Sequence, residues 1–302
     1  MEQIKSILAP EEVNFIVYHG QCCDGFGAAL SGYLLKKDGI KFYEGRFSAK
    51  REDEDLIRAV TDLGLTEKVN MVIVDFSYAK HFMDRLNQMC NSLILLDHHI
   101  SAQNELRDLP YCYFDQNRSG CTIAWEYFIG NTMYPRLLQM IEDRDLWRWQ
   151  VKDSRAFTTA FYSMVPYSFE KYKEFIDHPE LVDDFIARGQ LLMDYTKQQV
   201  IAANESTYYF VNKSGQKLAI INLTSNGSEY GEYVTVSGFA DYALTWVYDH
   251  SKKRIKVGIR SAKGSNNDCS ILAQRFNGGG HFNAAGFVFD GCIEELVNRL
   301  KF

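Results

Sequence analysis

The sequence lacks several features that would place it in other protein classes. No apolar run among its 302 residues approaches the roughly 20 needed to cross a bilayer. The first ten residues contain no long apolar segment, so we expect no secretory leader. The seven cysteines include no CxxC pair, and such an odd, scattered set predicts reduced thiols. Together these absences argue against a membrane protein and predict a cytoplasmic one.

The sequence also lacks an excess of positive charge. It has 33 Lys and Arg against 39 Asp and Glu, which gives a formal net charge of −6. A wide, sequence-blind surface for long duplex nucleic acid normally needs a basic face, so we expect no such partner. A small anionic ligand held by a few cations and a metal stays compatible with this charge. Hydrophobic residues make up 46% of the chain, which is enough for a sizeable core.

Strand and helix patterns alternate in the first half of the chain. Each buried strand pattern is followed by a helical one, which is typical of βαβ units and a parallel sheet. The expected strands are residues 13–19, 41–47, 69–77, 92–97 and 111–115, and the expected helices include 52–63, 79–90, 123–129 and 135–141.

The second half predicts a helical connector and a smaller domain. Residues 157–204 have a helical pattern, and the long polar stretch 179–203 is typical of a connector between domains. Strand patterns follow at 208–212, 217–223, 243–249 and 255–261. The predicted fold class is therefore α/β: a parallel-sheet N-terminal domain (1–185), a helical linker (186–207) and a smaller α/β C-terminal domain (208–302).

Three of the predicted strands end in groups that bind metals. The first ends at His19, the third delivers Asp75, and the fourth ends in Asp97, His98 and His99. Because the carboxyl ends of parallel strands meet at one edge of a sheet, we expect these side chains to converge. Unpaired carboxylates are costly to bury, so a shared cation is the simplest explanation.

The turn after the first strand adds further candidates. The stretch from Gly20 to Leu30 carries Cys22 and Asp24 among small residues. It resembles a phosphate-binding loop but lacks the GK[ST] of a P-loop and the GxGxxG of a dinucleotide fold. His19 and Asp24 suit a metal better than a bare phosphate. The alternative is a solvent-facing histidine and an N-capping aspartate.

Three other stretches have two interpretations each. Arg118 and Ser119 precede a helix, so Ser119 is either an N-cap or, with Arg118, part of an anion site. The acidic cluster 142–145, which includes Asp143, either meets a cation or forms a surface salt bridge with Arg144. Residues 278–281, Gly-Gly-Gly-His, either approach an anion closely or form a simple turn.

The order and spacing of these blocks resemble the DHH phosphoesterases that carry an associated C-terminal substrate-binding domain. The resemblance covers nearly the whole chain. Closest in size are the small members that resemble oligoribonucleases and linear dinucleotide phosphodiesterases. The blocks that carry it are His19 with Asp24-Gly25, Val74-Asp75, Asp97-His98-His99, Asp143, and Gly278-Gly279-Gly280-His281 followed by Ala284-Ala285-Gly286.

The resemblance implies a role for each matching residue. It implies two divalent metals, typically Mn²⁺, with Mg²⁺ or Zn²⁺ as alternatives, bridged by Asp75. It places Asp97 behind the metals and His99 at the scissile phosphate. The first metal would be held by His19 and Asp75; the second by Asp24, Asp75, His98 and Asp143; and the substrate's other end by Arg260, Ser261, Gly279, Gly280 and His281.

One position departs from the family pattern. The first block is often Asp-x-Asp, whereas here Cys22 stands two residues before Asp24. Either Cys22 is a ligand, or a differently spaced residue takes this place, or the first metal is held loosely. A thiolate favours softer metals such as zinc, so metal identity and count stay open at this point.

The predicted function is metal-dependent hydrolysis of short linear oligonucleotides, above all dinucleotides such as pGpG or pApA. Such dinucleotides remain after the breakdown of cyclic dinucleotide signals. The alternatives are a phosphatase or polyphosphatase acting on another small phosphoester, and a non-catalytic nucleotide-binding sensor. A homodimer is compatible with the sequence, and no membrane partner is expected.

Overall fold

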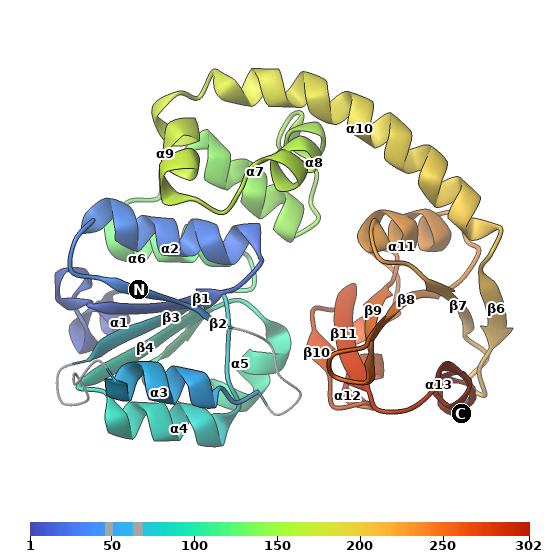
Figure 1. The fold of residues 1–302 in the computed structure, drawn as a ribbon, viewed down its shortest axis with the longest axis horizontal. Helices are drawn as coiled ribbons and strands as arrows, with labels where there is room; N and C mark the ends of the chain where they lie inside the picture. The colour runs from blue at the N-terminus through green and yellow to red at the C-terminus, as the bar shows by residue number, and fades with distance from the viewer. Residues whose placement is uncertain (46–50, 63–68) are drawn as a thin grey trace. The chain divides into compact units, whose positions relative to one another are not determined.

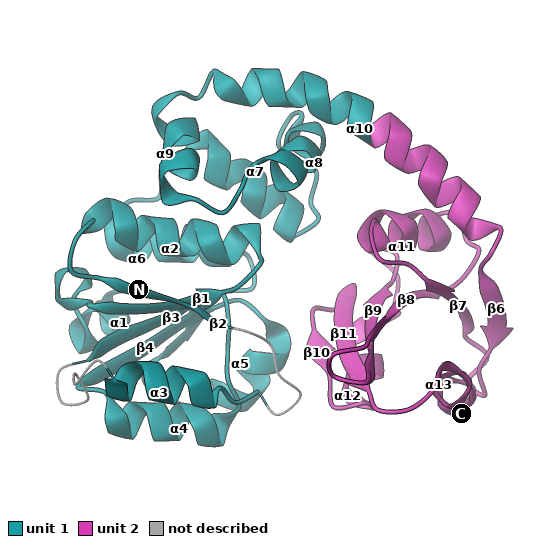
Figure 2. Cartoon of the chain, viewed as in Figure 1, with its two compact units in different colours: residues 1–192 teal, residues 193–302 magenta. Residues whose placement is uncertain are grey.

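The chain forms two compact units joined by one helix. The structure is a computed structural model that describes residues 1–45, 51–62 and 69–302. Residues 1–192 form the first unit and residues 193–302 the second (Figure 2). The division lies inside helix α10 (Leu181–Asn204), within the expected linker 186–207. The ends of the expected strand 41–47 and of the expected helix 52–63 lie outside the described residues.

A five-stranded parallel sheet is the centre of the first unit. Its strand order is β2-β1-β3-β4-β5, and every neighbouring pair is parallel. This confirms the predicted α/β class with a parallel sheet. The strands are β1 (Phe15–His19), β2 (Lys41–Gly45), β3 (Asn70–Val74), β4 (Ser92–Asp97) and β5 (Cys112–Phe114).

Helices cover both faces of this sheet (Figure 1). Alternate residues of β3 divide between two cores: Val72 packs in one core, and Ile73 packs in the other. A sheet buried on both faces explains why its strands are continuous apolar runs. The helices before α7 are α1 (Glu2–Ile7), α2 (Cys23–Leu35), α3 (Glu54–Asp62), α4 (Lys80–Met89), α5 (Ile100–Leu106) and α6 (Gly120–Ile129), with a 3₁₀ turn at Pro10–Glu12.

Three further helices complete the first unit. They are α7 (Arg136–Asp145), α8 (Ser154–Met164) and α9 (Phe169–Asp177). Buried aromatic side chains on α8 and α9, among them Phe161 and Tyr172, extend the core that contains α2 and α6. The rings of Phe161 and Tyr172 are 4.9 Å apart. This packing anchors α8 and α9 in the core and so supports α7. The last residue of α7 is Asp145.

The second unit contains a mixed six-stranded sheet in the order β10-β11-β9-β8-β7-β6. Only β7 and β8 are parallel among its described pairs. The strands are β6 (Tyr208–Val211), β7 (Lys217–Asn222), β8 (Tyr242–Asp249), β9 (Arg254–Arg260), β10 (Gly279–Gly280) and β11 (Ala284–Phe289). The helices are α11 (Gly227–Val236), α12 (Cys269–Gln274) and α13 (Ile293–Leu300). None of the described helices is long and apolar enough to cross a membrane.

Candidate metal centre

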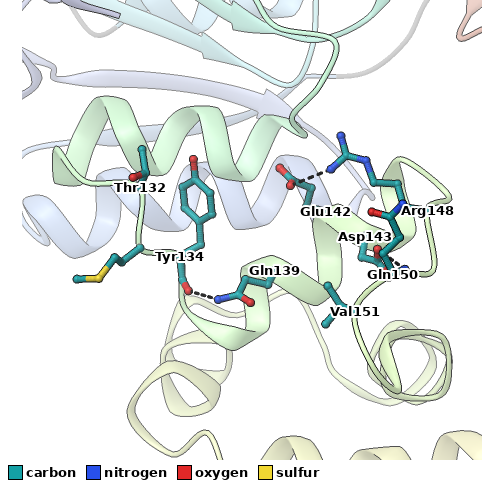
Figure 3. A pocket seen from close by; sticks show the side chains of 9 residues that line it. Thr132, Tyr134, Gln139, Glu142, Asp143, Arg148, Gln150 and Val151 are labelled. Atoms are coloured by element: carbon teal, nitrogen blue, oxygen red, sulfur yellow. Dashed lines mark hydrogen bonds and ion pairs between the residues drawn. The ribbon is translucent and has the colours of Figure 1, made fainter.

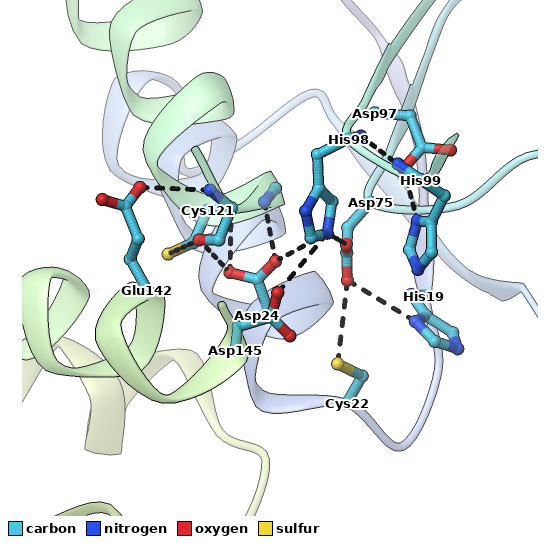
Figure 4. A network of polar contacts seen from close by, with 12 residues as sticks. His19, Cys22, Asp24, Asp75, Asp97, His98, His99, Cys121, Glu142 and Asp145 are labelled. Atoms are coloured by element: carbon cyan, nitrogen blue, oxygen red, sulfur yellow. Dashed lines mark hydrogen bonds and ion pairs between the residues drawn. The ribbon is translucent and has the colours of Figure 1, made fainter. Parts of the chain in front are cut away.

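Histidine, cysteine and aspartate side chains that could hold a metal converge at the carboxyl edge of the first sheet (Figure 4). They come from elements that are distant in the sequence but neighbours in the sheet order, because β1, β3 and β4 lie side by side. The contributing positions are His19 at the end of β1, Cys22 and Asp24 around the start of α2, Asp75 after β3, Asp97 to His99 at the end of β4, and Asp145 at the end of α7.

His98 lies at the centre of this group. Its Nε2 is 3.0 Å from Asp75 Oδ1, 3.8 Å from Asp24 Oδ2 and 3.5 Å from Asp145 Oδ2. The side chain is only 1% exposed. Burial alone would lower the pKa of His98, but the hydrogen bond to Asp75 and the charge of Asp145 raise it to about 10. One buried imidazole thus faces three carboxylates.

Asp24 is held by the N-terminus of α6. The amide of Gly120 donates to its Oδ2 at 2.7 Å, and the amide of Cys121 donates to its Oδ1 at 3.0 Å. The hydroxyl of Ser119 donates to the same Oδ1 at 2.6 Å. Burial, together with the charge of Asp75, raises the pKa of Asp24 well above its usual value. The helix N-terminus fixes the carboxylate, and the crowding of acids favours an added cation.

Asp75 connects the two sides of the cluster. Its backbone has a φ of 56°, the left-handed region that few residues other than glycine adopt, although aspartate is among the more tolerant. Burial would raise the pKa of Asp75, but its interactions with the imidazoles of His19 and His98 hold it well below its usual value. The two imidazoles therefore favour the ionised form of Asp75.

Asp97 orients the last histidine of the motif. It is fully buried and accepts from the backbone amide of His98 at 2.8 Å, from His99 Nδ1 at 2.7 Å and from the hydroxyl of Ser77. Burial would raise the pKa of Asp97, but the interaction with His99 lowers it to about 2. This carboxylate fixes the orientation of the His99 ring.

The donor atoms fit divalent metals. His19, Cys22 and Asp75 form one group and Asp24, His98 and Asp145 another, and in each the three ligand atoms lie within 4.8 Å of one another. Both groups combine nitrogen with carboxylate oxygen, which transition metals accept. The buried Oδ2 of Asp145 accepts no hydrogen bond from any described residue. The cluster thus presents oxygen and nitrogen ligands at an edge where a cation would balance the negative charge.

Asp145, which the sequence motifs do not single out, is in the cluster, whereas Asp143 is not. Asp143 accepts from the hydroxyl of Ser154 and, at 2.9 Å, from the amide of Gln150. Successive residues of a helix are rotated by about 100°, so residues two positions apart differ by roughly 200° in direction. Residues 143 and 145 therefore point to opposite sides of α7. Both follow buried apolar residues one turn earlier, so the hydrophobic pattern does not distinguish them.

Asp143 instead borders a pocket of about 540 Å³ (Figure 3). None of the lining residues belongs to the metal-binding groups. Arg148 and Glu142 face one another there, with 3.4 Å between Nη1 and Oε1. Glu142 also accepts from the amide of Ser119 at 3.1 Å.

Arg118 and Ser119 have partners within the first unit. The guanidinium of Arg118 forms ion pairs with Asp115 and Glu126 and donates to the hydroxyl of Tyr113 at 2.9 Å. Ser119 occupies the N-cap position of α6 without a side-chain capping bond, since its hydroxyl donates to Asp24. The anion at this helix N-terminus is therefore the carboxylate of Asp24, and contact of Arg118 or Ser119 with substrate stays a prediction.

The candidate substrate residues of the second unit gather at one end of its sheet. Gly280 pairs with Ala285, and the neighbouring Ala284 pairs with Arg260. Gly280 has a φ of 140°, and a Cβ there would lie 2.6 Å from the carbonyl oxygen of Ala284, so glycine is required. The register brings together Arg260, Ser261, Gly279, Gly280 and His281.

Arg260 and Ser261 are held by neighbouring side chains. The Nη2 of Arg260 donates to the hydroxyl of Ser228 at 2.9 Å. The hydroxyl of Ser261 accepts from Asn283 Nδ2 at 3.0 Å. These contacts show how the loop is supported, and its binding of substrate stays a prediction.

Comparison with known proteins gives one relative by sequence and several by fold. No family model matches the chain. The "Uncharacterized protein R106" of Acanthamoeba polyphaga mimivirus is 30% identical over 296 residues, which cover 95% of this chain and 70% of that protein.

Two solved structures share the fold. The DHH domain of PF0399, which is described as a member of a family of ribosomal proteins, matches with a TM-score of 0.59 and 15% identity over 99% of this chain and 88% of that chain. The exonuclease RecJ bound to manganese matches with a TM-score of 0.51 and 13% identity over 100% of this chain and 92% of that chain. The chain therefore belongs to the family of mimivirus protein R106 and has the fold of the DHH-domain proteins.

Proposed function

We propose that this protein is a metal-dependent phosphodiesterase that hydrolyses short linear oligonucleotides, above all dinucleotides such as pGpG or pApA, to mononucleotides. The observation that carries the proposal is the position of His98, whose Nε2 lies within 3.8 Å of carboxylates from three separate helices and loops. Several buried acids around one imidazole would destabilise a purely structural core, because their charges are costly to bury. The same arrangement suits a metal centre.

The ligands divide between two metals. His19 and Asp75 would hold the first metal, and Asp24, Asp75, His98 and Asp145 would hold the second, with Asp145 in place of Asp143. The manganese in the RecJ structure supports Mn²⁺ as one metal to test. When bound, two such ions activate water as a nucleophile and stabilise the attacking and leaving oxygens of a phosphoryl transfer.

The protein's own residues position these groups. Asp97 holds the Nδ1 side of the His99 ring, and we assign the opposite nitrogen, Nε2, to an oxygen of the scissile phosphate. The α6 N-terminus holds Asp24 through two amides, which fixes the orientation of this proposed ligand. Hydrogen bonds that hold the ligands themselves in place are typical of metal sites.

The second unit is proposed to hold the other end of the substrate. The register of β9, β10 and β11 places the His281 imidazole and the Arg260 guanidinium near one end of the same sheet, and these two groups suit a phosphate. The net charge of −6 argues for a short ligand over a long duplex. A dinucleotide in the cytoplasm, from the turnover of cyclic dinucleotide signals, fits these features.

A cleavage panel tests the proposal. Purified protein is freed of metal with a chelator and then incubated with pGpG, pApA, a longer oligonucleotide, a mononucleotide or polyphosphate, each with Mn²⁺, Mg²⁺ or Zn²⁺. We expect metal-dependent release of mononucleotides from the dinucleotides and almost none from Asp75→Asn. Preferential hydrolysis of polyphosphate would replace the proposal with the polyphosphatase alternative. Binding of dinucleotides without cleavage under every metal would indicate a sensor.

A further inference from the structure

Cys22 lies in a position that differs chemically from the other cysteines. It is the N-cap residue of α2, directly after the turn that follows β1. Its Sγ is 3.7 Å from Asp75 Oδ2, and the Nδ1 of His19 is 3.5 Å from the same oxygen. Among the described residues, Cys22 is the cysteine that belongs to a group able to hold a metal.

The remaining cysteines have other surroundings. The Sγ of Cys23 is 3.9 Å from the hydroxyl of Tyr167, and the Sγ of Cys121 is 3.3 Å from the hydroxyl of Ser119. Cys292 is exposed at the start of α13. These thiols therefore serve as internal references for any property that depends on Cys22.

His19 Nδ1 and Cys22 Sγ each lie close enough to Asp75 Oδ2 to share one ion with it. Ligands at about 2.0–2.3 Å from a tetrahedral zinc lie about 3.3–3.8 Å apart. The 3.5 Å between His19 Nδ1 and Asp75 Oδ2 and the 3.7 Å between Cys22 Sγ and the same oxygen lie within this range.

We propose that the Sγ of Cys22 is a ligand of the first metal, with His19 and Asp75, and that this position takes a thiophilic divalent ion such as zinc in preference to manganese. Sulfur ligands favour zinc, whereas manganese favours carboxylate and water. The thiol proton passes to solvent as the sulfur–metal bond forms, so no oxidant or reductant is needed. The inference rests on the proposed metal centre and adds the identity of one ion to it.

Cobalt provides a readout that is independent of activity. Co²⁺ bound by a thiolate has a charge-transfer absorption in the near ultraviolet that oxygen and nitrogen ligands do not give. Metal-free full-length protein, kept reduced and anaerobic, is titrated with Co²⁺. We expect this band in the wild type and in Cys292→Ser, and its loss in Cys22→Ser and Cys22→Asp. Circular dichroism of each variant establishes that it is folded.

Competition between metals gives the second measurement. Wild type and Cys22→Asp are dialysed against equal concentrations of Zn²⁺ and Mn²⁺, and the bound metals are quantified by elemental mass spectrometry. We expect the ratio of zinc to manganese to fall at least ~10-fold in Cys22→Asp, while the total metal content is retained. Retained metal shows that the site survives the substitution.

Two results would overturn the inference, and they differ from a failure of the proposed function. A band that persists in folded Cys22→Ser, or wild-type protein that binds Co²⁺ without the band, contradicts Cys22 as a ligand but leaves the metal centre in place. A wild type that binds none of these ions contradicts the metal centre itself.

Discussion

Asp143 and Asp145 lie two positions apart on α7 and have different surroundings. Asp145 Oδ2 is 3.5 Å from His98 Nε2, whereas both oxygens of Asp143 accept hydrogen bonds from the segment that follows α7. At the scale of single residues, direction around a helix thus decides which of two identical side chains reaches the candidate metal.

Substitution of these two residues should have opposite effects. We expect Asp145→Asn to lower metal affinity at least ~10-fold with little change in stability, since even supporting residues of metal sites contribute this much. We expect Asp143→Asn to keep metal binding and to lower the free energy of unfolding by about 2 kcal/mol, because it weakens buried hydrogen bonds to a charged group. Isothermal titration with Mn²⁺ measures the metal affinity of each variant, and urea unfolding measures its stability. The reverse pattern would restore Asp143 as the ligand.

Asp97 predicts a specific dependence of stability on pH. Its pKa is about 2 in the folded protein, below the usual value of roughly 4 in an unfolded chain. A lowered pKa stabilises the fold fully above pH ~4, and this contribution is lost as the pH falls towards 2. The shift corresponds to roughly 2–3 kcal/mol.

Urea unfolding of wild type and Asp97→Asn, in chelator without metal, measures this contribution. We expect the difference in unfolding free energy between the two proteins to be constant from pH 7 to 5 and to shrink below pH 4. A difference that stays constant down to pH 3 would show that Asp97 has an ordinary pKa.

With metal restored, we expect Asp97→Asn to lower kcat more than it raises KM, since Asp97 acts through His99.

At the scale of elements, the centre depends on close approach between helices and strand ends. A Cβ on Gly25 of α2 would lie 2.5 Å from the carbonyl oxygen of His19. A Cβ on Gly120 of α6 would lie 2.3 Å from the Cβ of Asp75. Both helices therefore approach the strand ends at glycine, which brings Asp24 and the α6 amides to the cluster.

A pair of glycine substitutions in the same helix tests this requirement. We expect Gly25→Ala to lower stability by about 1–3 kcal/mol and to weaken metal binding, because backbone must move away from the new methyl group. Gly27→Ala is the matched control: its Cβ would meet only side chains, the nearest being Cys121 at 3.1 Å, and alanine favours the helix. Thermal unfolding and metal titration measure both. Equal effects of the two substitutions would contradict a special role for Gly25.

At the scale of the whole molecule, the proposed metal ligands and the proposed substrate-binding residues lie in different units. The proposed metal ligands all lie within residues 1–192, and the candidate substrate loop at residues 279–281 lies within 193–302. Each unit has hydrophobic clusters of its own among the described residues. Metal binding and substrate binding should therefore respond to different substitutions.

The variant His281→Ala separates substrate binding from metal binding. We expect it to lower kcat/KM for a dinucleotide at least ~10-fold, the effect of losing about 1.4 kcal/mol of transition-state binding, with unchanged metal content. His250→Ala, an exposed histidine of the same unit, serves as the control and should leave both quantities unchanged. Steady-state kinetics and elemental analysis provide the readouts. Wild-type kinetics in His281→Ala would remove this loop from the substrate site.

The linear sequence determined the α/β class, the parallel sheet and the strand-end positions of His19, Asp75 and Asp97. These follow from local patterns, since apolar runs of strand length alternate with helices and parallel strands present their carboxyl ends together.

Only the tertiary structure decided that Asp145, and not Asp143, lies beside His98. It also decided that Ser119 and the α6 N-terminus hold Asp24. These depend on the rotation of α7 and on a contact between residues 95 positions apart. No local pattern encodes such contacts, because packing of the helices against the sheet sets them.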